Sequence, residues 1–287
     1  MDSETARRLC CITSEFYREH SDSFSATRHA PWAGWERCLE AIGTEAFERK
    51  DGEDLDSKGN WVFDDKDGGG FGSTGGEAFG RSGDEAVSVF DLACGNLRFE
   101  SFLESAFPAV DFEFYAVDKC DALAFGGAET TLRSSLRYRS IDILSALSAG
   151  KIDVPVCDLA VAFGFMHHVP GALDRGRVLA ELVSHTRPGG FAAVSFWRFL
   201  NDEGLAEKAR ASHARARDEL GLPELDEGDY LLGWRNEPGA YRYCHSFSDA
   251  EIDELAGSVA DRASVVARFS ADGRTGDLNT YVVFRAR

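Results

Sequence analysis

Apolar residues near the start of the chain recur at the spacing of an amphipathic helix. Leu9, Ile12 and Phe16 share one helical face, and a second set with the same spacing runs from Trp35 to Ile42. The stretch FSATRHAPW lies between the two sets, ahead of every strand-like segment. The sequence therefore predicts two helices joined by a short segment rich in aromatic and polar residues.

From residue 87 onward, short apolar runs alternate with helical spacing. A helix with Phe99 and Leu103 on its buried face follows the first run, and a helix with Val178 and Leu182 precedes the fifth. Near-continuous apolar strands that alternate with amphipathic helices predict a parallel sheet covered on both faces. The five predicted strands are AVSVFDL, DFEFYAVD (111–118), LRYRSIDIL (136–144), CDLAVAFGF (157–165) and GGFAAVSFW (189–197).

The end of the chain has a different pattern. The runs SVVARFS and NTYVVFRA flank a turn that contains Gly273 and Gly276, which is typical of a hairpin. With 287 residues, the chain is long enough for one large α/β domain. The predicted fold class is α/β, a Rossmann-like sheet that is mostly parallel, with an antiparallel C-terminal hairpin and helices on both faces.

The amino-acid composition indicates an acidic insertion and a strongly negative net charge. Residues 49–86 hold ten Asp and Glu, five Lys and Arg, and ten of the 29 glycines, so a flexible insertion is expected there. The formal net charge of −18 counts against unaided binding of RNA or DNA, since polyanions repel an acidic surface. The helical stretch LAEKARASHARARDELG is basic, and it is the predicted phosphate contact if RNA is bound.

The lack of targeting signals and of cysteine motifs in the sequence narrows the class of protein further. Residues 1–20 carry charges throughout, and no run reaches the ~18 apolar residues that cross a bilayer, so a cytoplasmic protein without membrane contact is expected. The seven cysteines form no C-x-x-C pair, which predicts reduced thiols and no metal site.

Acidic residues stand where the predicted strands end. In an open parallel sheet, ligands bind beyond the carboxyl ends of the strands. Asp91 and Gly95 belong to the turn after the first strand, and Asp118 follows 23 residues past Gly95, a spacing that suits a carboxylate on ribose hydroxyls. Asp142 is placed to meet a purine amino group, and Phe163-Gly164-Phe165 ends the fourth strand. Together these residues predict a ligand that contains adenosine.

The turn and the hairpin resemble those of class I S-adenosylmethionine-dependent methyltransferases. That family has a D-x-G-x-G-x-G turn, and here Ala93 and Leu97 replace its first and third glycines. A nicotinamide-dependent enzyme would keep G-x-G-x-x-G, which is absent after Gly95. The resemblance implies S-adenosylmethionine as the cofactor, with S-adenosylhomocysteine as product. It implies as cofactor-binding residues Phe24, Thr27, Arg28, Asp91, Ala93, Cys94, Gly95, Asp118, Lys119, Asp142, Ile143, Phe163, Gly164 and Phe165.

Three further stretches resemble a narrower family, the enzymes that methylate carboxymethyl groups on wobble uridines of tRNA. They are FYREHSDSFSATRHAPW, AVAFGFMHHVPGALDRGRVLAEL and DYLLGWRNEPGAYRYCHSFSDAEIDEL, with Cys244 in place of that family's second tyrosine in R-Y-Y-H. The resemblance implies tRNA as the acceptor and a small activating subunit as a partner. Two alternatives stay open: a small carboxylate or hydroxyl metabolite as the acceptor, favoured by the acidic charge, and a non-catalytic cofactor-binding module, suggested by Ala93 and Leu97.

Catalytic candidates follow from the reaction. A carboxylate acceptor needs no general base at neutral pH, because its pKa is about 4, but it needs cationic donors such as arginine. Histidines could orient the acceptor, or act as a base on a hydroxyl or amine. The candidate catalytic residues are Arg28, His167, His168, Arg242 and His245, with Arg235 as a further arginine. The segment around Arg28 is expected to form a lid, in which Trp32 fixes the N-terminal helices to the sheet.

The expected organisation is one methyltransferase domain in five parts. They are an N-terminal helical lid (1–48), the flexible insertion (49–86), a cofactor-binding core (87–200), a substrate-side insertion (201–249), and a C-terminal helix and hairpin (250–287).

Overall fold

The structure is a computed structural model, which describes residues 1–28, 30–43, 86–125, 132–150 and 152–287. The predicted flexible insertion at 49–86 lies outside the described residues, apart from Ala86. No described helix is long and apolar enough to cross a membrane.

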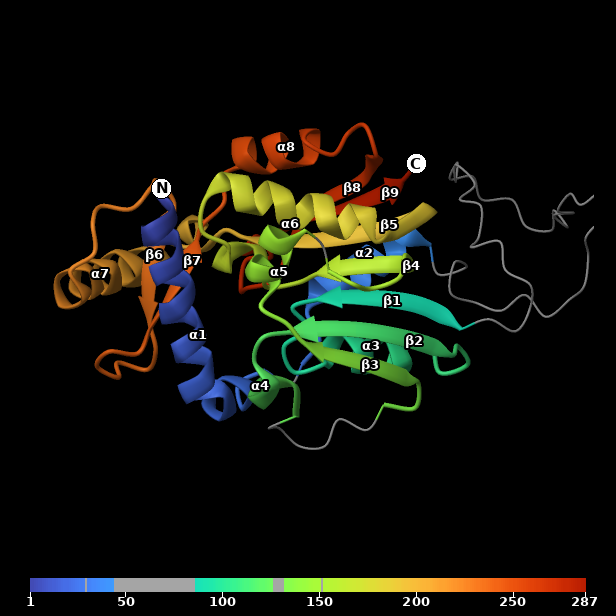
Figure 1. Cartoon of the computed structure of the whole chain (residues 1–287), viewed down its shortest axis with the longest axis horizontal. Coiled ribbons are helices and arrows are strands. Elements are labelled where there is room, and N and C mark those ends of the chain that lie inside the picture. Colours follow the sequence, from blue (N-terminus) through green and yellow to red (C-terminus); the bar gives the residue numbers. More distant parts are fainter. Residues whose placement is uncertain (29, 44–85, 126–131, 151) are drawn as a thin grey trace, which may run out of the picture.

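A seven-stranded sheet forms the centre of the fold (Figure 1), in the order β3-β2-β1-β4-β5-β9-β8. The first five strands of the chain are parallel to one another, and β9 is antiparallel to both β5 and β8. The predicted parallel sheet with an antiparallel C-terminal hairpin is therefore confirmed. The strands are β1 (Val87–Leu92), β2 (Phe112–Asp118), β3 (Ser135–Ser140), β4 (Cys157–Ala162), β5 (Thr186–Trp197), β8 (Ala263–Ala271) and β9 (Asn279–Ala286).

Helices cover both faces of the sheet because successive strand residues face opposite sides. In β1, Val89 belongs to the apolar cluster under α2 and α3, whereas Phe90 belongs to the cluster under α5, α6 and α8. Figure 1 shows these two helical layers. The helices are α2 (Ala33–Ile42), α3 (Arg98–Ala106), α5 (Ile143–Ala149), α6 (Ala172–Ser184) and α8 (Asp249–Gly257).

Two predicted strands end earlier than expected, and both ends matter for the site. The strand predicted at 136–144 stops at Ser140, because the Asp142 side chain accepts a hydrogen bond from the Ser145 amide and caps α5. The strand predicted at 157–165 stops at Ala162. Gly164 then takes a positive φ of 74°, which turns the chain into the short helix η2 (Met166–His168).

The N-terminal helix and a small separate unit lie beside the carboxyl ends of the strands (Figure 1). Helix α1 (Ser3–Ser25) packs against β7 and the short helix α4 (Asp121–Phe125). The two-stranded sheet of β6 (Asp229–Gly233) and β7 (Tyr241–His245) packs with α7 (Glu203–Leu220) and follows the short helix η3 (Phe199–Asn201). The segment predicted as a substrate-side insertion therefore forms one compact unit next to α1.

A buried ionic cluster joins this unit to α8. His245 lies between two carboxylates, with Nδ1 2.6 Å from Asp229 Oδ1 and Nε2 2.9 Å from Glu251 Oε1. Burial alone would lower the pKa of His245, but hydrogen bonds to both carboxylates outweigh burial and raise the pKa. The two carboxylates therefore favour the protonated form of His245, which links β7 to α8.

The stability of the protein should depend on pH through His245. A raised folded pKa stabilises the fold fully below the unfolded value of about 6.5, and the stabilisation is lost as pH rises through the folded pKa. We expect His245→Gln to lower the free energy of unfolding by about 3 kcal/mol at pH 6, and by less at higher pH. Denaturant titrations over the pH range measure this. His213→Gln is the control, since burial lowers the pKa of His213; a pH-independent loss for His245→Gln would contradict the prediction.

Candidate active site

A cavity of about 1060 Å³ opens at the carboxyl ends of β1, β2 and β4, under α1 and its following segment. It brings together nearly all the residues that the sequence predicts for the site. Those that line it are Phe24, Thr27, Arg28, Asp91, Ala93, Cys94, Gly95, Asp118, Lys119, Asp142, Ile143, Phe163, Gly164, Phe165, His167, His168 and Arg242.

The turn after β1 keeps left-handed backbone at the positions where Ala93 and Leu97 replace glycine. Their φ angles are 69° and 57°, and Gly95 between them has 57°. The left-handed backbone conformation destabilises a residue with a Cβ by about 1 kcal/mol or more. Leu97 is buried against Cys94 and Ala116, so packing offsets part of that strain. Ala93 and Leu97 therefore adopt the left-handed conformation that glycine takes most easily.

Asp118 holds this turn against the end of β2. One carboxylate oxygen accepts a hydrogen bond from the Gly95 amide at 2.9 Å, and the other accepts from the Cys120 amide at 2.8 Å. Burial raises the pKa of Asp118, while these backbone hydrogen bonds act in the opposite direction. Each carboxylate oxygen keeps a lone pair for a ligand, since a carboxylate offers about four acceptor positions.

Asp142 and Lys119 form an ion pair on the same side of the cavity. Lys119 Nζ lies 2.5 Å from Asp142 Oδ2, and Asp142 also caps α5. Burial raises the pKa of Asp142, but the hydrogen bonds from Lys119 and Ser145 outweigh it and lower the pKa. Asp142 is therefore ionised and held in place at the end of β3.

The segment between α1 and α2 is fastened across the mouth of the cavity. Asn96 Nδ2 donates to the Arg28 carbonyl at 3.3 Å, and Arg98 Nη1 donates to the Ala30 carbonyl at 2.8 Å. Trp32 lies against Gly164, where a Cβ would come within 2.9 Å of its ring. Trp32 thus lines the cavity as well as packing on Trp35.

Arg28 and Arg242 enter the cavity, and no ion pair with a carboxylate is found for either among the described residues. Arg28 lies on the Phe24 ring, 3.5 Å from its centroid, and burial lowers its pKa to about 10. Arg242 is only 7% exposed and lies over the rings of Phe16 and Trp234; its Nη1 has no hydrogen-bond partner in the described part of the chain. Buried guanidinium groups of this kind favour a bound anion.

Tyr17 and His168 meet across the cavity, and their hydrogen bonds define the tautomer of the histidine. His168 Nδ1 lies 2.8 Å from the Tyr243 carbonyl, which can only accept, so Nδ1 carries the proton. Nε2 is then bare and accepts from the Tyr17 hydroxyl at 2.8 Å. Burial lowers the pKa of His168 to about 3, so the imidazole is neutral and serves poorly as a general base.

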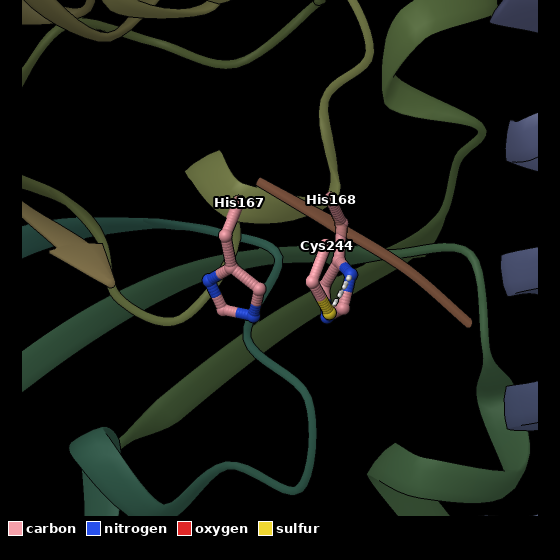
Figure 2. Close-up of side chains that lie close together, drawn as sticks. All are labelled: His167, His168 and Cys244. Carbon is pink, nitrogen blue, oxygen red and sulfur yellow. Dashed lines mark hydrogen bonds between the residues drawn. The ribbon is translucent and has the colours of Figure 1, made fainter. Parts of the chain in front are cut away.

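His167, His168 and Cys244 lie close together beside the cavity (Figure 2), and they are the group of described residues that could hold a metal ion. Their donor atoms lie within 4.8 Å of one another, wider than the ~3.5 Å separation around tetrahedral zinc. Both His168 nitrogens already have partners, and the buried thiol pKa is raised to about 11. Arg28 and Arg242 add positive charge nearby, so the cluster disfavours a cation.

Two candidates from the sequence lie elsewhere. His245 does not line the cavity, because both ring nitrogens are bound by Asp229 and Glu251 in the buried cluster, so its predicted role on the acceptor does not fit. Arg235 lies over the Trp234 ring outside the cavity lining and donates to the Ser23 carbonyl.

The sequence reasoning missed a group of lining residues on one face of α1. These residues recur at helical spacing, which a closer reading of the helix pattern could have shown. They are Cys10, Thr13, Ser14 and Tyr17. Trp197, at the end of β5, was also missed; its ring packs edge to face on His167 at 4.9 Å.

Comparison with known proteins identifies the fold. No family model and no curated protein matches the chain. Among solved structures, the complex of DhpI with SAM and HEP is 14% identical, covers 96% of this chain and 97% of DhpI, and gives a TM-score of 0.53. A SAM-dependent methyltransferase from Methanosarcina mazei is 16% identical, covers 71% of this chain and 93% of that chain, and gives 0.51.

The chain has the class I methyltransferase fold. In its sheet, β9 lies antiparallel between β5 and β8, and the TM-scores with these structural neighbours are above 0.5. The cavity therefore lies at the place where this Rossmann-like fold binds ligands, at the carboxyl ends of the parallel strands.

Zinc should not stabilise this protein through the cluster of His167, His168 and Cys244. A metal at a hundred times its dissociation constant would add about 2.7 kcal/mol to stability, which is several degrees in melting temperature. We expect no such rise on adding Zn²⁺, and no fall on adding a chelator, in thermal unfolding experiments. A rise that His167→Gln abolishes would contradict the prediction.

Proposed function

We propose that this protein is an S-adenosylmethionine-dependent methyltransferase that acts on an anionic acceptor. The observation that carries the proposal is the charge pattern of the cavity. Acidic side chains, among them Asp91 and Asp118, lie at the strand ends, whereas Arg28 enters from the segment after α1 and Arg242 from β7. The sulfonium and ammonium of S-adenosylmethionine would face the acidic side chains. The arginines would then bind the anionic group of the acceptor.

The residues at the strand ends fit this cofactor. The turn at 93–97 brings backbone close to the cavity, as the amino-acid part of the cofactor requires. Asp118 retains lone pairs for ribose hydroxyls, and Asp142 is ionised at the end of β3, where a purine amino group would meet it. DhpI, which covers nearly the whole chain, was solved with SAM bound, which supports the same cofactor here.

The reaction would need little from the protein beyond positioning. The sulfonium supplies an already activated methyl group, so in-line placement of the acceptor accounts for much of the rate. A carboxylate is ionised at neutral pH and needs no base. Arg28 and Arg242 would hold its charge, and neutral His167 and His168 would orient it without repelling the cofactor. Pairing of Tyr17 with His168 keeps that imidazole in one tautomer.

A small anionic molecule is the acceptor that the geometry favours. Arg242 is almost fully buried under α1, and the protein carries a net charge of −18. A tRNA carboxymethyluridine is the second candidate, favoured by the three sequence stretches that resemble the wobble-uridine enzymes and by basic Arg210 and Arg217 on α7. Labelled methyl transfer to total RNA and to a small-molecule extract separates the two; a requirement for a small activating subunit would favour the tRNA.

Cofactor affinity should depend on Asp118. Loss of a charged hydrogen-bond acceptor costs about 1.5 to 3 kcal/mol, or roughly tenfold to more than a hundredfold in affinity. We expect Asp118→Asn to weaken S-adenosylmethionine binding by that factor in calorimetry, while Lys119→Gln, on the cavity edge, has a smaller effect. Because Asp118 also holds the Gly95 amide, a melting curve checks the fold of each variant. Unchanged affinity in a folded variant would refute the assignment.

Arg28 should affect turnover far more than stability. An arginine that holds the acceptor through two parallel hydrogen bonds loses that geometry in Arg28→Lys and all contact in Arg28→Ala. We expect both variants to lose at least tenfold in kcat/KM for the true acceptor, with melting temperatures near wild type. Arg235→Ala, outside the cavity, is the matched control. Full activity of Arg28→Ala would show that the residue has no role in the site.

A further inference from the structure

Tyr17 reaches across the cavity from one half of the sheet to the other. Its backbone carbonyl accepts from the Cys120 thiol just after β2, at 3.7 Å, and its hydroxyl meets His168 just after β4. Because β1 lies between β2 and β4 in the sheet, the side chain of Tyr17 spans the end of β1. The hydroxyl therefore lies on the β4 side of the cavity, whereas Asp118 ends β2.

The proton of this hydroxyl is directed at His168. Nδ1 of His168 donates to the Tyr243 carbonyl at 2.8 Å, and the Cys244 sulfur lies farther from that nitrogen, at 3.8 Å. Nε2 is therefore a bare acceptor, and the Tyr17 hydroxyl, 2.8 Å away, is its donor. Burial raises the pKa of Tyr17 and lowers the pKa of His168 to about 3, so both groups are neutral.

The Tyr17 oxygen can therefore only accept hydrogen bonds from a ligand in the cavity. A phenolic hydroxyl has one proton and keeps lone pairs after donating it. Tyr17 lines the cavity, and no N–H or O–H group of the described residues donates to its oxygen. A carboxylate placed here would face these lone pairs, or it would take the proton and leave His168 Nε2 buried without a partner. Both arrangements cost free energy.

Cationic donors for an anion lie around the same ring as this acceptor. The Phe24 ring packs edge to face on Tyr17, with the two centroids 4.9 Å apart. The central guanidinium carbons of Arg28 and Arg242 lie 3.5 Å and 5.9 Å from the Phe24 centroid. Both arginines line the cavity, and Arg242 Nη1 has no hydrogen-bond partner among the described residues. The site therefore offers cationic donors and one neutral acceptor to the same ligand.

We propose that Tyr17 is a specificity-determining residue that selects an acceptor with an N–H or O–H group near its anionic group. The inference rests on the proposed function. The anionic group binds the arginines, and the N–H or O–H group donates to the Tyr17 oxygen. His168 is a positioning residue, because it acts through the hydroxyl proton of Tyr17. Small carboxylates with an amine, amide or hydroxyl group have this chemistry, and so does a uridine whose imide accompanies a carboxymethyl group.

Cofactor binding gives a first test that needs no acceptor. In calorimetry, we expect Tyr17→Phe to bind S-adenosylmethionine and S-adenosylhomocysteine within about twofold of wild type, because the oxygen contacts the acceptor instead. Tyr241→Phe is the matched control, since its hydroxyl donates to Glu219 and lies outside the cavity lining. A loss of roughly tenfold in a folded Tyr17→Phe, absent from the control, would mean that the oxygen binds the cofactor, and it would overturn the inference.

Acceptor specificity gives the second test. Labelled methyl transfer to total RNA and to a small-molecule extract supplies the acceptor and distinguishes a uridine from a metabolite. The acceptor is then compared with an analogue in which a carbon atom replaces the N–H or O–H group nearest the anion. We expect wild type and Tyr241→Phe to prefer the acceptor by at least about tenfold in kcat/KM, and Tyr17→Phe to lose that preference. His168→Leu should lose it too, because the Tyr17 hydroxyl is then free to donate.

The outcomes separate this inference from the proposed function. Absence of labelled product from both pools would refute the proposed function. A labelled acceptor without an N–H or O–H group, or equal kcat/KM for acceptor and analogue in wild type, would overturn the role of Tyr17 and leave methyl transfer standing. A preference that survives in Tyr17→Phe would overturn it as well. If Tyr17→Phe does not fold, His168→Leu decides: loss of the preference supports the role of Tyr17, and its persistence overturns it.

Discussion

The carboxylate of Asp118 is the contact on which the geometry of the site depends. By accepting hydrogen bonds from the amides of Gly95 and Cys120, it joins the turn after β1 to the end of β2. The turn contains left-handed residues that carry a Cβ, so it is strained and needs such a tie. Asn96 and Arg98 follow directly and hold the segment after α1. One buried carboxylate thus positions the floor of the cavity and, through the turn, part of its cover.

Most of the fold could be predicted from the sequence because its signals are local. Apolar runs and helical spacing determine the strands and helices, and the two glycines at the end of the chain indicate the antiparallel hairpin. The strand predicted through residue 144 failed because Asp142 caps a helix, a side-chain contact that outweighs an apolar run. The small sheet of β6 and β7 could not be placed, since its position depends on packing against α1.

Without the family resemblance, the lining of the cavity was predictable mainly where strand ends define it. Asp91, Asp118 and Asp142 each follow a strand, and the topology of a parallel sheet brings such positions together. Tyr17 comes from α1, 151 residues before His168 in the chain, so only the folded structure reveals their hydrogen bond. His245 was predicted to act on the acceptor because it lies in a stretch that resembles a family motif. In the structure, both of its ring nitrogens bind carboxylates of the buried ionic cluster.

Charge is separated across the cavity in a way that the total of −18 conceals. Asp91, Asp118 and Asp142 lie at the ends of strands of the sheet, whereas Arg28 follows α1 and Arg242 lies on β7. Opposite charges that are buried but kept apart cannot neutralise each other, so each set costs free energy until a ligand supplies the missing charge. A molecule with a cationic centre and a second molecule with an anionic group would relieve both costs together. For the proposed function, this constraint favours simultaneous binding of cofactor and acceptor, the arrangement that direct transfer between them requires.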